Sequence, residues 1–227
     1  MNFEAALRGM RNPLNSWDKS DTGWIDDDDF EVDNFIAEAW KEQVDGLLHR
    51  VKVIGENDMA LAKKLIAAGS DHRKFLRQIF VSVDITAPLY WWKEFDTYTV
   101  GTTRNSCSTM HKIHSKPIEL SDFSIDDFEV EEVYDFDSTL FSGLFSNVIA
   151  DCEMLRQKFL ATKDRRYWRA LIQLLPESYN QKRTVTMTYE NLRNMYHARR
   201  GHKLDEWRVG FMEWIDTLPY ADELIKS

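Results

Sequence analysis

The hydrophobic and polar positions of the chain switch several times between helical and strand periods. From Asp33 to Val51 apolar residues recur every three or four positions, at Ile36, Trp40, Val44, Leu47, Leu48 and Val51. This spacing places them on one face and predicts an amphipathic helix. A second helix is predicted from Asn57 to Ala68, and Gly69 ends it because glycine commonly follows the last helical residue.

The next segment alternates with a period of two. In "QIFVSVDIT" one face holds Ile79, Val81, Val83 and Ile85, and the other holds Ser82, Asp84 and Thr86. Such alternation is typical of a half-buried strand. Pro88 ends this strand and can open a helix through "LYWWKEFDTY", because proline is favoured in the first turn of a helix.

The longest predicted helix lies in the second half of the chain. Its apolar stripe consists of Leu140, Phe141, Leu144, Phe145, Val148, Ile149, Cys152, Leu155 and Phe159. Shorter helices are predicted at 165–175, 189–200 and 204–218, and "RTVTMT" predicts a strand among them. Helices dominate, one sheet is expected, and no linker or internal repeat divides the chain. The expected fold is a single α+β domain over residues 1–227, with a central antiparallel sheet packed by helices.

Composition agrees with one large domain. The 227 residues are 43% hydrophobic and 13% aromatic, which is enough for a sizeable core. No apolar run reaches the length of a membrane span, and the N-terminus lacks a basic segment followed by an apolar one. Cys107 and Cys152 have no metal or redox spacing, so reduced thiols and a cytoplasmic location are expected.

The net charge of −9 argues against binding of duplex DNA, which requires clustered Lys and Arg. It leaves room for a small anionic ligand held by a few local cations. Much of the acidic charge lies at Asp26–Asp33 and Asp122–Asp137. Neither stretch has the glycine turn and ligand spacing of a calcium loop, so no metal is assigned. Solvated linkers and helix N-termini are expected there, since Asp favours caps.

A dense polar stretch follows the aromatic segment. Six of the sixteen residues in "TVGTTRNSCSTMHKIH", from Thr99 to His114, carry a hydroxyl. A flexible loop and the lining of a ligand pocket are the two explanations. His111 and His114 could share a metal on a helix, but no third ligand is fixed nearby, which favours ordinary hydrogen-bonding histidines. Cys107 has no identifiable base and is expected to line a pocket rather than act as a nucleophile.

An arginine occupies the inward stripe of the helix predicted at 189–200. In "YENLRNMYHARRG" the positions of Leu192, Met195 and Tyr196 continue at Arg199, and Gly201 stops the helix. A buried arginine requires a carboxylate, a phosphate or a carbonyl as partner. Alternatively, a cation in the last turn suits the helix dipole, and its long stem can reach solvent. The residues alone leave both interpretations open.

The segment "ALIQLLPESYNQKRTVTMTYENLRNMYHAR" resembles the C-terminal signature of flavin-dependent thymidylate synthases. In that family a Leu-Pro pair precedes a Thr-x-Asn element and a helix that ends in Leu-Arg. The corresponding residues here are Leu175-Pro176, Thr186-Met187-Thr188 and Ala198-Arg199. Upstream, "DHRKFLRQIFVSVDITAP" resembles the family's His-x-Ser-Pro segment and the strand after it, which also ends in Ala-Pro. The resemblance covers roughly residues 70–211, whereas residues 1–55 have no recognised correspondence.

The resemblance implies two sets of ligand-binding residues. The flavin set is His72, Tyr98, Thr99, Thr188 and Asn194. The set for a pyrimidine nucleotide is Arg104, Asn105, Ser106, Cys107, Ser108 and Arg199. Arg199 takes the position of a family arginine that binds the nucleotide phosphate, and Asn194 that of an asparagine that contacts the flavin. No catalytic residue is assigned.

The chain departs from the family where the phosphates bind. The family's Arg-His-Arg triplet reads Thr97-Tyr98-Thr99 here, and its Asn-Glu-x-Ser-x-Arg element falls on Arg104–Thr109 or one residue later. The family's C-terminal Ala-Gln-x-Glu-Ile element is replaced here by Leu204-Asp205-Glu206-Trp207-Arg208. Threonines offer neutral hydroxyls in place of charged donors, so the pocket lining looks rebuilt and the activity altered.

The resemblance implies a flavin-dependent methyltransferase that acts on dUMP or a related pyrimidine nucleotide. FAD would carry the hydride, and NADPH and methylene-tetrahydrofolate would take part only if the family reaction is retained. The alternative is a catalytically inactive relative that serves as a ligand-binding or assembly protein. Because family active sites are assembled from several subunits, the resemblance also implies a homotetramer.

Overall fold

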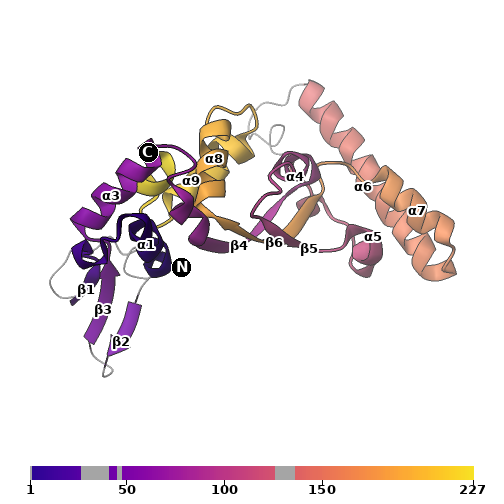
Figure 1. Ribbon diagram of the computed structural model, residues 1–227. Coiled ribbons are helices and arrows are strands. Elements are labelled where there is room, and N and C mark those ends of the chain that lie inside the picture. Colours follow the sequence, from indigo (N-terminus) through magenta and orange to yellow (C-terminus); the bar gives the residue numbers. More distant parts are fainter. Residues whose placement is uncertain (1, 27–40, 45–47, 126–135) are drawn as a thin grey trace. The chain divides into compact units, whose positions relative to one another are not determined.

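Helices and antiparallel strands both contribute to the structure, so the expected α+β class is confirmed (Figure 1). The computed structural model describes residues 2–26, 41–44, 48–125 and 136–227. These form two compact units. Unit 1 contains residues 1–82, 99–103 and 186–227, and unit 2 contains residues 83–98 and 104–185. The organisation of residues 1–227 as a single domain stays a prediction.

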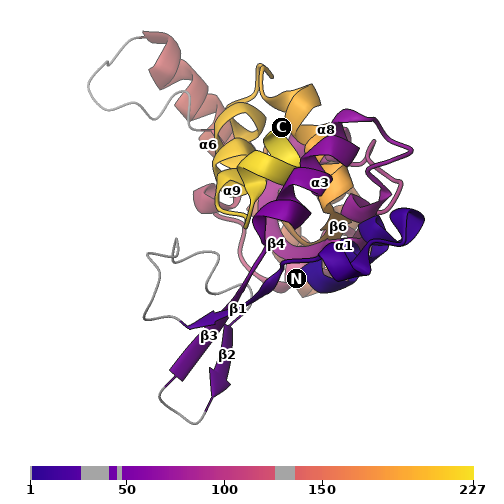
Figure 2. The ribbon, with the colours of Figure 1, turned by 60° about the vertical axis from the view of Figure 1, so that its left-hand side comes forward.

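Unit 1 is mainly helical and carries a small sheet (Figure 2). Its helices are α1 (Phe3–Arg11), α3 (Glu56–Ala67), α8 (Tyr189–Arg199) and α9 (Met212–Asp216). Its short helical segments are η1 (Asn12–Leu14), η2 (Trp17–Lys19), η4 (Lys74–Gln78), η8 (Glu206–Phe211) and η9 (Asp222–Lys226). Strands β1 (Gly23–Asp26), β2 (Lys41–Val44) and β3 (Leu48–Val53) pair antiparallel in the order β1-β3-β2.

The helix predicted from Asp33 to Val51 is wrong wherever the structure describes it. Lys41–Val44 and Leu48–Val53 are strands, and Lys41 pairs with Val51; the part of the prediction at 33–40 lies outside the described residues. Val51 and Val53 flank Lys52, which is the alternation of a strand. Asp45-Gly46 between the two strands is a strong sequence signal for a hairpin. Pairing with β1 on the other side of β3 supplies backbone hydrogen bonds that a period-based prediction does not consider.

The N-terminal residues, which had no recognised correspondence, provide a helix to the core of unit 1. In α1 the buried apolar side chains follow helical spacing: Phe3, Ala6, Leu7 and Met10. The Phe3 ring lies 5.5 Å from the Tyr189 ring, edge to face. The Asn2 side chain donates to the Gln78 carbonyl and accepts from the Phe80 amide, which ties α1 to the start of strand β4 (Phe80–Pro88).

The other predicted helices of unit 1 are confirmed. The prediction at 57–68 is α3, and Gly69 follows it with a φ of 102°, a left-handed conformation that favours glycine. The prediction at 189–200 is α8, which buries Leu192 and Met195. The prediction at 204–218 is divided between the π-helical segment η8 and α9.

Unit 2 contains the longest helix. Its helices are α4 (Leu89–Phe95), α5 (Thr109–Lys112), α6 (Phe136–Thr162) and α7 (Arg165–Leu174), with the turns η5 (Ile113–Ser115) and η6 (Leu120–Asp122). A buried cluster joins α6 and α7 to η5 and the connecting segments, and it consists of Ile113, Ile118, Phe123, Cys152, Leu171 and Tyr179. The helices expected after Pro88, after the acidic stretch and at 165–175 are therefore confirmed. Within the stripe predicted for α6, Leu144 is an exception because it is exposed.

A second sheet has the order β4-β6-β5, so the expectation of one sheet is wrong. Strands β4 (Phe80–Pro88) and β6 (Asn180–Thr188) belong in part to each unit, and β5 is Thr103–Ser106. The Ser82 and Thr186 hydroxyls hydrogen-bond at 2.8 Å, and Thr184 donates to Asp84 at 2.6 Å, so β4 and β6 run antiparallel. Ser82, Asp84 and Thr86 are exposed while Val81 is buried. The alternation predicted for this strand is confirmed.

None of the helices in the described part of the chain is long and apolar enough to cross a membrane. Large parts of the acidic stretches Asp26–Asp33 and Asp122–Asp137 lie outside the described residues.

Candidate functional site

Two arginines of unit 2 share one carboxylate beside the polar stretch. Arg104 donates to Asp96 Oδ1 at 2.6 Å, and Arg183 donates to the same oxygen at 2.8 Å. Arg104 also donates to the Tyr98 carbonyl at 3.0 Å, and Arg183 to Gln181 Oε1 at 2.9 Å. We call Asp96, Arg104 and Arg183 the Asp96 cluster. Two guanidinium groups and one carboxylate leave it with a net charge of +1.

The two guanidinium groups lie over aromatic rings of α4. The Arg183 guanidinium is 4.2 Å from the Trp92 ring centroid, and that of Arg104 is 5.7 Å from the Phe95 centroid. Both rings are buried, and Trp92 Nε1 donates to the Gln181 carbonyl at 2.9 Å. The arginine side chains are 17% and 14% exposed, whereas Asp96 is 44% exposed. The two guanidinium groups therefore lie on buried aromatic rings while the carboxylate faces solvent.

The polar stretch is hydrogen-bonded to residues of β6 and of α8. In unit 2, the Cys107 amide donates to the Lys182 carbonyl at 2.9 Å, and Gln181 Nε2 donates to the Cys107 carbonyl at 2.7 Å. In unit 1, Asn191 Nδ2 donates to the Val100 carbonyl at 2.7 Å. Next to it, Gly101 has a φ of 75° and lies so close to the Asn191 side chain that a Cβ would be 3.1 Å from Asn191 Oδ1. These hydrogen bonds hold Val100 to α8 and Cys107 to β6.

Several predicted ligand residues are accessible on this ordered stretch. The exposed ones are Thr99, Asn105, Ser106, Cys107 and Ser108, and Tyr98 is half-buried. Ser108 Oγ accepts from the His111 amide at 2.9 Å and so begins α5. Arg104 lies next to Tyr98 because its guanidinium donates a hydrogen bond to the Tyr98 backbone carbonyl. The stretch thus offers hydroxyls, an amide and a thiol next to a cationic cluster.

The ligand-binding residues that were predicted in the segments of unit 1 differ in the exposure of their side chains. His72 lies in the turn after α3, where its amide donates to the Gly69 carbonyl at 3.0 Å, and its side chain is exposed. Asn194 is exposed on α8. Thr188 is buried, and its hydroxyl hydrogen-bonds Asn191 Oδ1 at 2.7 Å as part of the cap of α8. The Thr188 hydroxyl is thus already engaged in holding the helix start.

Arg199 is half-buried, as its place on the inward stripe predicts. Its guanidinium lies 5.2 Å from the ring centroid of Trp207, which is fully buried. The aromatic face attracts the cation electrostatically, so the ring acts as a partner that neither sequence interpretation considered. Arg200, one residue further, is exposed.

Sequence reasoning missed Arg183 and Gln181. Arg183 begins "RTVTMT", which predicts only a strand, and Gln181 lies two residues before it. Their spacing of two residues places them on one face of β6, and Lys182 and Thr184 lie on the other. That alternation indicates that Gln181 and Arg183 share a face of the strand, but nothing in it indicates that Asp96 and the aromatic rings of α4 pack against this face.

The surroundings of His111, His114 and Cys152 differ, and the buried Nδ1 of His114 has no hydrogen-bond partner among the described residues. His111 is exposed, and the His114 ring packs edge to face on Phe159 at 5.0 Å. Among the residues described, no group of three His, Cys, Asp or Glu side chains is arranged to hold a metal ion. Burial raises the pKa of the Cys152 thiol to about 11, which disfavours its nucleophilic thiolate.

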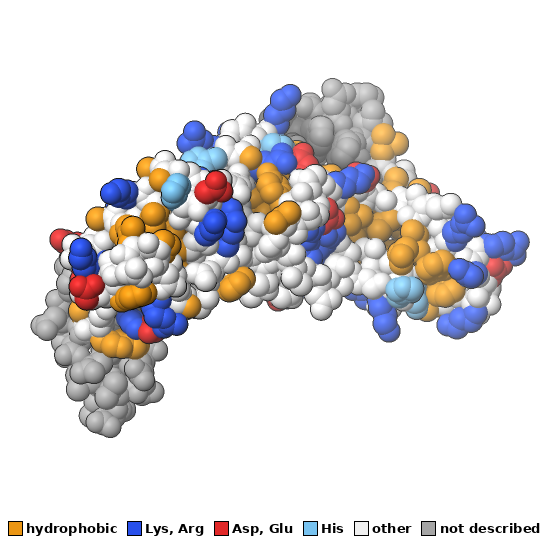
Figure 3. Space-filling model, in the orientation of Figure 1, with side chains coloured by type: hydrophobic (Ala, Val, Ile, Leu, Met, Phe, Trp, Pro, Cys, Tyr) orange, Lys and Arg blue, Asp and Glu red, His pale blue; other side chains and the backbone are white. Residues whose placement is uncertain are grey.

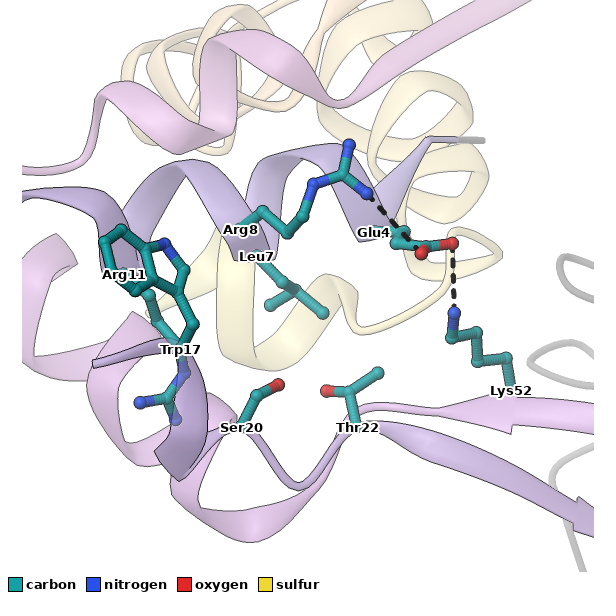
Figure 4. A pocket seen from close by; sticks show the side chains of 8 residues that line it. All are labelled: Glu4, Leu7, Arg8, Arg11, Trp17, Ser20, Thr22 and Lys52. Atoms are coloured by element: carbon teal, nitrogen blue, oxygen red, sulfur yellow. Dashed lines mark hydrogen bonds and ion pairs between the residues drawn. The ribbon is translucent and has the colours of Figure 1, made fainter. Parts of the chain in front are cut away.

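A cavity of about 130 Å³ lies in unit 1 between α1, η2 and β3 (Figure 4). Glu4 stands between Arg8 and Lys52 at its edge, at 3.5 and 3.0 Å. At the other end, the fully buried Asp58 accepts hydrogen bonds from Arg11, Ser20 and Thr22 at 2.5, 2.7 and 2.6 Å. We call these four residues the Asp58 cluster. Because its polar groups satisfy one another, it is a structural anchor.

The sequence matches no protein-family model and no curated protein. Solved structures do match. A flavin-dependent thymidylate synthase (ThyX) from Helicobacter pylori, complexed with FAD and dUMP, aligns with 100% of this chain and 95% of its own, at 15% identity and a TM-score of 0.63. Another structure of thymidylate synthase X from Helicobacter pylori, with FAD and dUMP, aligns with 100% of this chain and 94% of its own, at 16% identity and a TM-score of 0.62. The chain has the fold of a flavin-dependent thymidylate synthase.

Proposed function

We propose that this protein binds FAD and a pyrimidine nucleotide and acts as a flavin-dependent methyltransferase on dUMP or a close relative of it. The observation that carries the proposal is the alignment of the whole chain with thymidylate synthases complexed with those two ligands. At this level of identity the fold alone is shared, so the function depends on the residues of the site.

The Asp96 cluster fits the anionic parts of both ligands. Arg104 and Arg183 both pair with Asp96, which directly precedes the Thr97-Tyr98-Thr99 that replaces the family's Arg-His-Arg triplet. Guanidinium groups bind phosphate through two parallel hydrogen bonds and lose little freedom when they are already held in place. These two arginines would therefore supply some of the charge that the substituted triplet lacks.

The remaining proposed contacts are polar. Tyr98, Thr99, His72, Asn194 and the cap residue Thr188 are proposed to lie at the flavin, and their side chains would position the ring system by hydrogen bonds. Asn105, Ser106, Cys107 and Ser108 are proposed to meet the nucleotide together with Arg104 and Arg199. FAD, when bound, would supply hydride transfer; NADPH and methylene-tetrahydrofolate belong to the proposal only in the form that retains the family reaction.

A homotetramer is part of the proposal. Several large hydrophobic side chains of the single chain are exposed, among them Val100, Leu144 and Met154. Burial of such side chains between copies would be favourable. Light scattering at micromolar concentration should give four copies, and a stable monomer would contradict a site shared between subunits.

The proposal is tested by titration of FAD, followed by flavin fluorescence, and by thermal unfolding with dUMP. We expect FAD binding and a dUMP-dependent rise in the unfolding temperature. Rescue of a thymidine-requiring bacterium then tests turnover. A protein that binds neither FAD nor dUMP would refute the proposal.

A second candidate is a relative that has lost the reaction and retains ligand binding or assembly. The neutral residues Thr97-Tyr98-Thr99 favour it, as does Asp96, which neutralises part of the charge of the two arginines. FAD and dUMP binding without growth on thymidine-free medium would identify this case.

A further inference from the structure

The charge of this acidic chain is distributed unevenly. Fourteen of its 38 Asp and Glu residues lie in the stretches Asp26–Asp33 and Asp122–Asp137, which hold no Lys or Arg. The remaining 24 acidic residues are outnumbered by the 29 Lys and Arg. The rest of the chain is therefore net cationic, and its anion-binding capacity is not apparent from the overall charge of −9.

The cations are dense where α6 ends and α7 begins. We call five exposed residues there the α7 face: Lys158, Lys163, Arg165, Arg166 and Arg169. Asp164 is the sole acidic residue between 154 and 173. It caps α7 by accepting from the Arg166 amide at 2.9 Å, and it pairs with the Arg166 guanidinium at 2.6 Å. Four cations of the α7 face therefore lack a carboxylate of this segment to balance them.

An open hollow lies beside these cations. Its volume is about 510 Å³, and its lining combines Met110, Trp168 and Ile172 with Arg165, Arg166 and Arg169. Trp168 Nε1 donates to the Met110 carbonyl at 2.7 Å, which fixes α5 against α7. At the end of unit 2 that α5 and α7 occupy, Lys and Arg side chains surround a hydrophobic patch (Figure 3).

Aromatic rings lie between the cations. The Arg165 guanidinium is 5.7 Å from the Trp168 ring centroid, and Lys158 Nζ is 5.6 Å from that of Tyr167. These contacts hold the long side chains near the surface of the helices. A solvated surface helix needs no such mixture, because isolated exposed lysines and arginines satisfy solubility without an apolar hollow between them.

We propose that the α7 face binds single-stranded nucleic acid. Arginines bind phosphates through paired hydrogen bonds, and proteins that bind single strands combine a cationic track with apolar or aromatic surfaces for unstacked bases. The hollow takes a base, and the cations from Lys158 to Arg169 follow the phosphates. A duplex is disfavoured because its bases are stacked and paired and so do not enter the hollow. This proposal does not depend on the proposed enzymatic function.

The test measures fluorescence anisotropy of a labelled thymidylate oligomer of about twelve nucleotides, a length within the site sizes known for single strands. With four cations engaged, the logarithm of affinity should fall with the logarithm of salt concentration with a slope of about −3. An abasic oligomer of the same length and charge should bind several-fold more weakly, because it leaves the hollow empty.

Two double variants with the same change in net charge locate the site. Arg165→Glu with Arg169→Glu should weaken binding about tenfold or more, since each arginine contributes a charge-assisted contact. Lys63→Glu with Lys64→Glu, on exposed positions of α3 in unit 1, is the matched control and should change affinity less than about twofold at salt concentrations that screen distant charges. Circular dichroism checks the folding of both, and Arg165→Gln with Arg169→Gln replaces the first variant if it does not fold.

Three results would overturn the proposal. Equal loss in both double variants would indicate general electrostatic attraction. Absence of oligomer binding at low salt would show that the face does not bind nucleic acid. Tighter binding of a polyglutamate peptide than of the oligomer would assign the face to an acidic protein instead.

Discussion

The Asp58 cluster of unit 1 and the Asp96 cluster of unit 2 use the same residue types in opposite ways. Asp58 is 0% exposed and its partner Arg11 5%, and one guanidinium balances one carboxylate. Asp96 is 44% exposed and is shared by Arg104 and Arg183. A closed, neutral cluster has no capacity for a ligand and would leave an uncompensated charge if either partner were removed. An open cluster with excess positive charge can exchange its contact with Asp96 for contacts with an incoming anion.

The largest effect is expected when the closed cluster is broken. Asp58→Ala leaves the Arg11 guanidinium buried without its carboxylate and should lower the free energy of unfolding by about 3–5 kcal/mol. Ser20→Ala removes one of the hydrogen bonds to the same carboxylate and should cost about 1 kcal/mol. Urea unfolding measures both. Equal, small losses would show that the Asp58 cluster is not the anchor of the N-terminal segment.

Titration of the Asp58 carboxylate should contribute to the pH dependence of the unfolding free energy. Burial alone would raise the pKa of Asp58, but the hydrogen bonds from Ser20, Thr22 and Arg11 outweigh it and lower the pKa. A carboxylate with a lowered pKa stabilises the folded state above its unfolded pKa and loses that contribution as the pH falls through its folded pKa. In Asp58→Asn that part of the acid dependence should be absent.

The open cluster should respond through ligand affinity instead. Arg183→Ala removes one charged donor, which is worth about 1.5–3 kcal/mol, and should weaken dUMP binding about 10- to 100-fold. Its unfolding free energy should change less than that of Asp58→Ala. Lys182→Ala, on the opposite face of the same strand, is the control, and calorimetric titration of both variants provides the measurement. Unchanged dUMP affinity in Arg183→Ala would remove the Asp96 cluster from the proposed site.

A third cluster, in unit 2, tests whether a charged cluster stabilises the fold because it is buried and paired or because it belongs to unit 1. In unit 2, Glu153 accepts hydrogen bonds from Arg156, from Gln157 and from the Ile118 amide, and Arg156 is 6% exposed. The hydrogen bond from Arg156 contributes most to lowering the pKa of Glu153 to about 2. If burial and mutual pairing make a charged cluster stabilising, the Glu153 cluster should stabilise unit 2 as the Asp58 cluster stabilises unit 1.

The expected signature is the pH dependence of Glu153→Gln. The stability difference from the natural protein should be constant above the ordinary glutamate pKa of 4.5 and should shrink as the pH falls toward 2. Urea unfolding at neutral pH and near pH 3 measures it. A difference of the same size at both pH values would show that the Glu153 charge does not contribute.

The smallest effect is expected at Arg199. Arg199→Ala removes the cation from the face of Trp207 and should lower the free energy of unfolding by about 0.5–1 kcal/mol. Arg200→Ala, at the exposed neighbour, should have almost no effect. Thermal unfolding with and without dUMP sharpens the comparison, because loss of the dUMP-dependent shift in Arg199→Ala alone would add a ligand role to the contact with Trp207.

The sequence by itself determined the elements whose patterns are local. The alternation at 79–86 predicted β4, and helical spacing with a following glycine predicted α3, because each pattern reflects burial of one face of one segment. The motifs around Leu175-Pro176 and Arg199 indicated the family whose fold the whole chain shares. They also implied ligand-binding residues within 97–109, most of which is exposed.

Only the tertiary structure decided which residues meet across long separations. Arg183 reaches Asp96 over 87 positions, and Arg11 reaches Asp58 over 47. Strand pairing in the same way overrode the helical spacing read from Val44 to Val51. The physical reason is common to all three. Periodicity reports the face that a segment buries, whereas the partner of a charge or a strand edge depends on chain packing that no local pattern encodes.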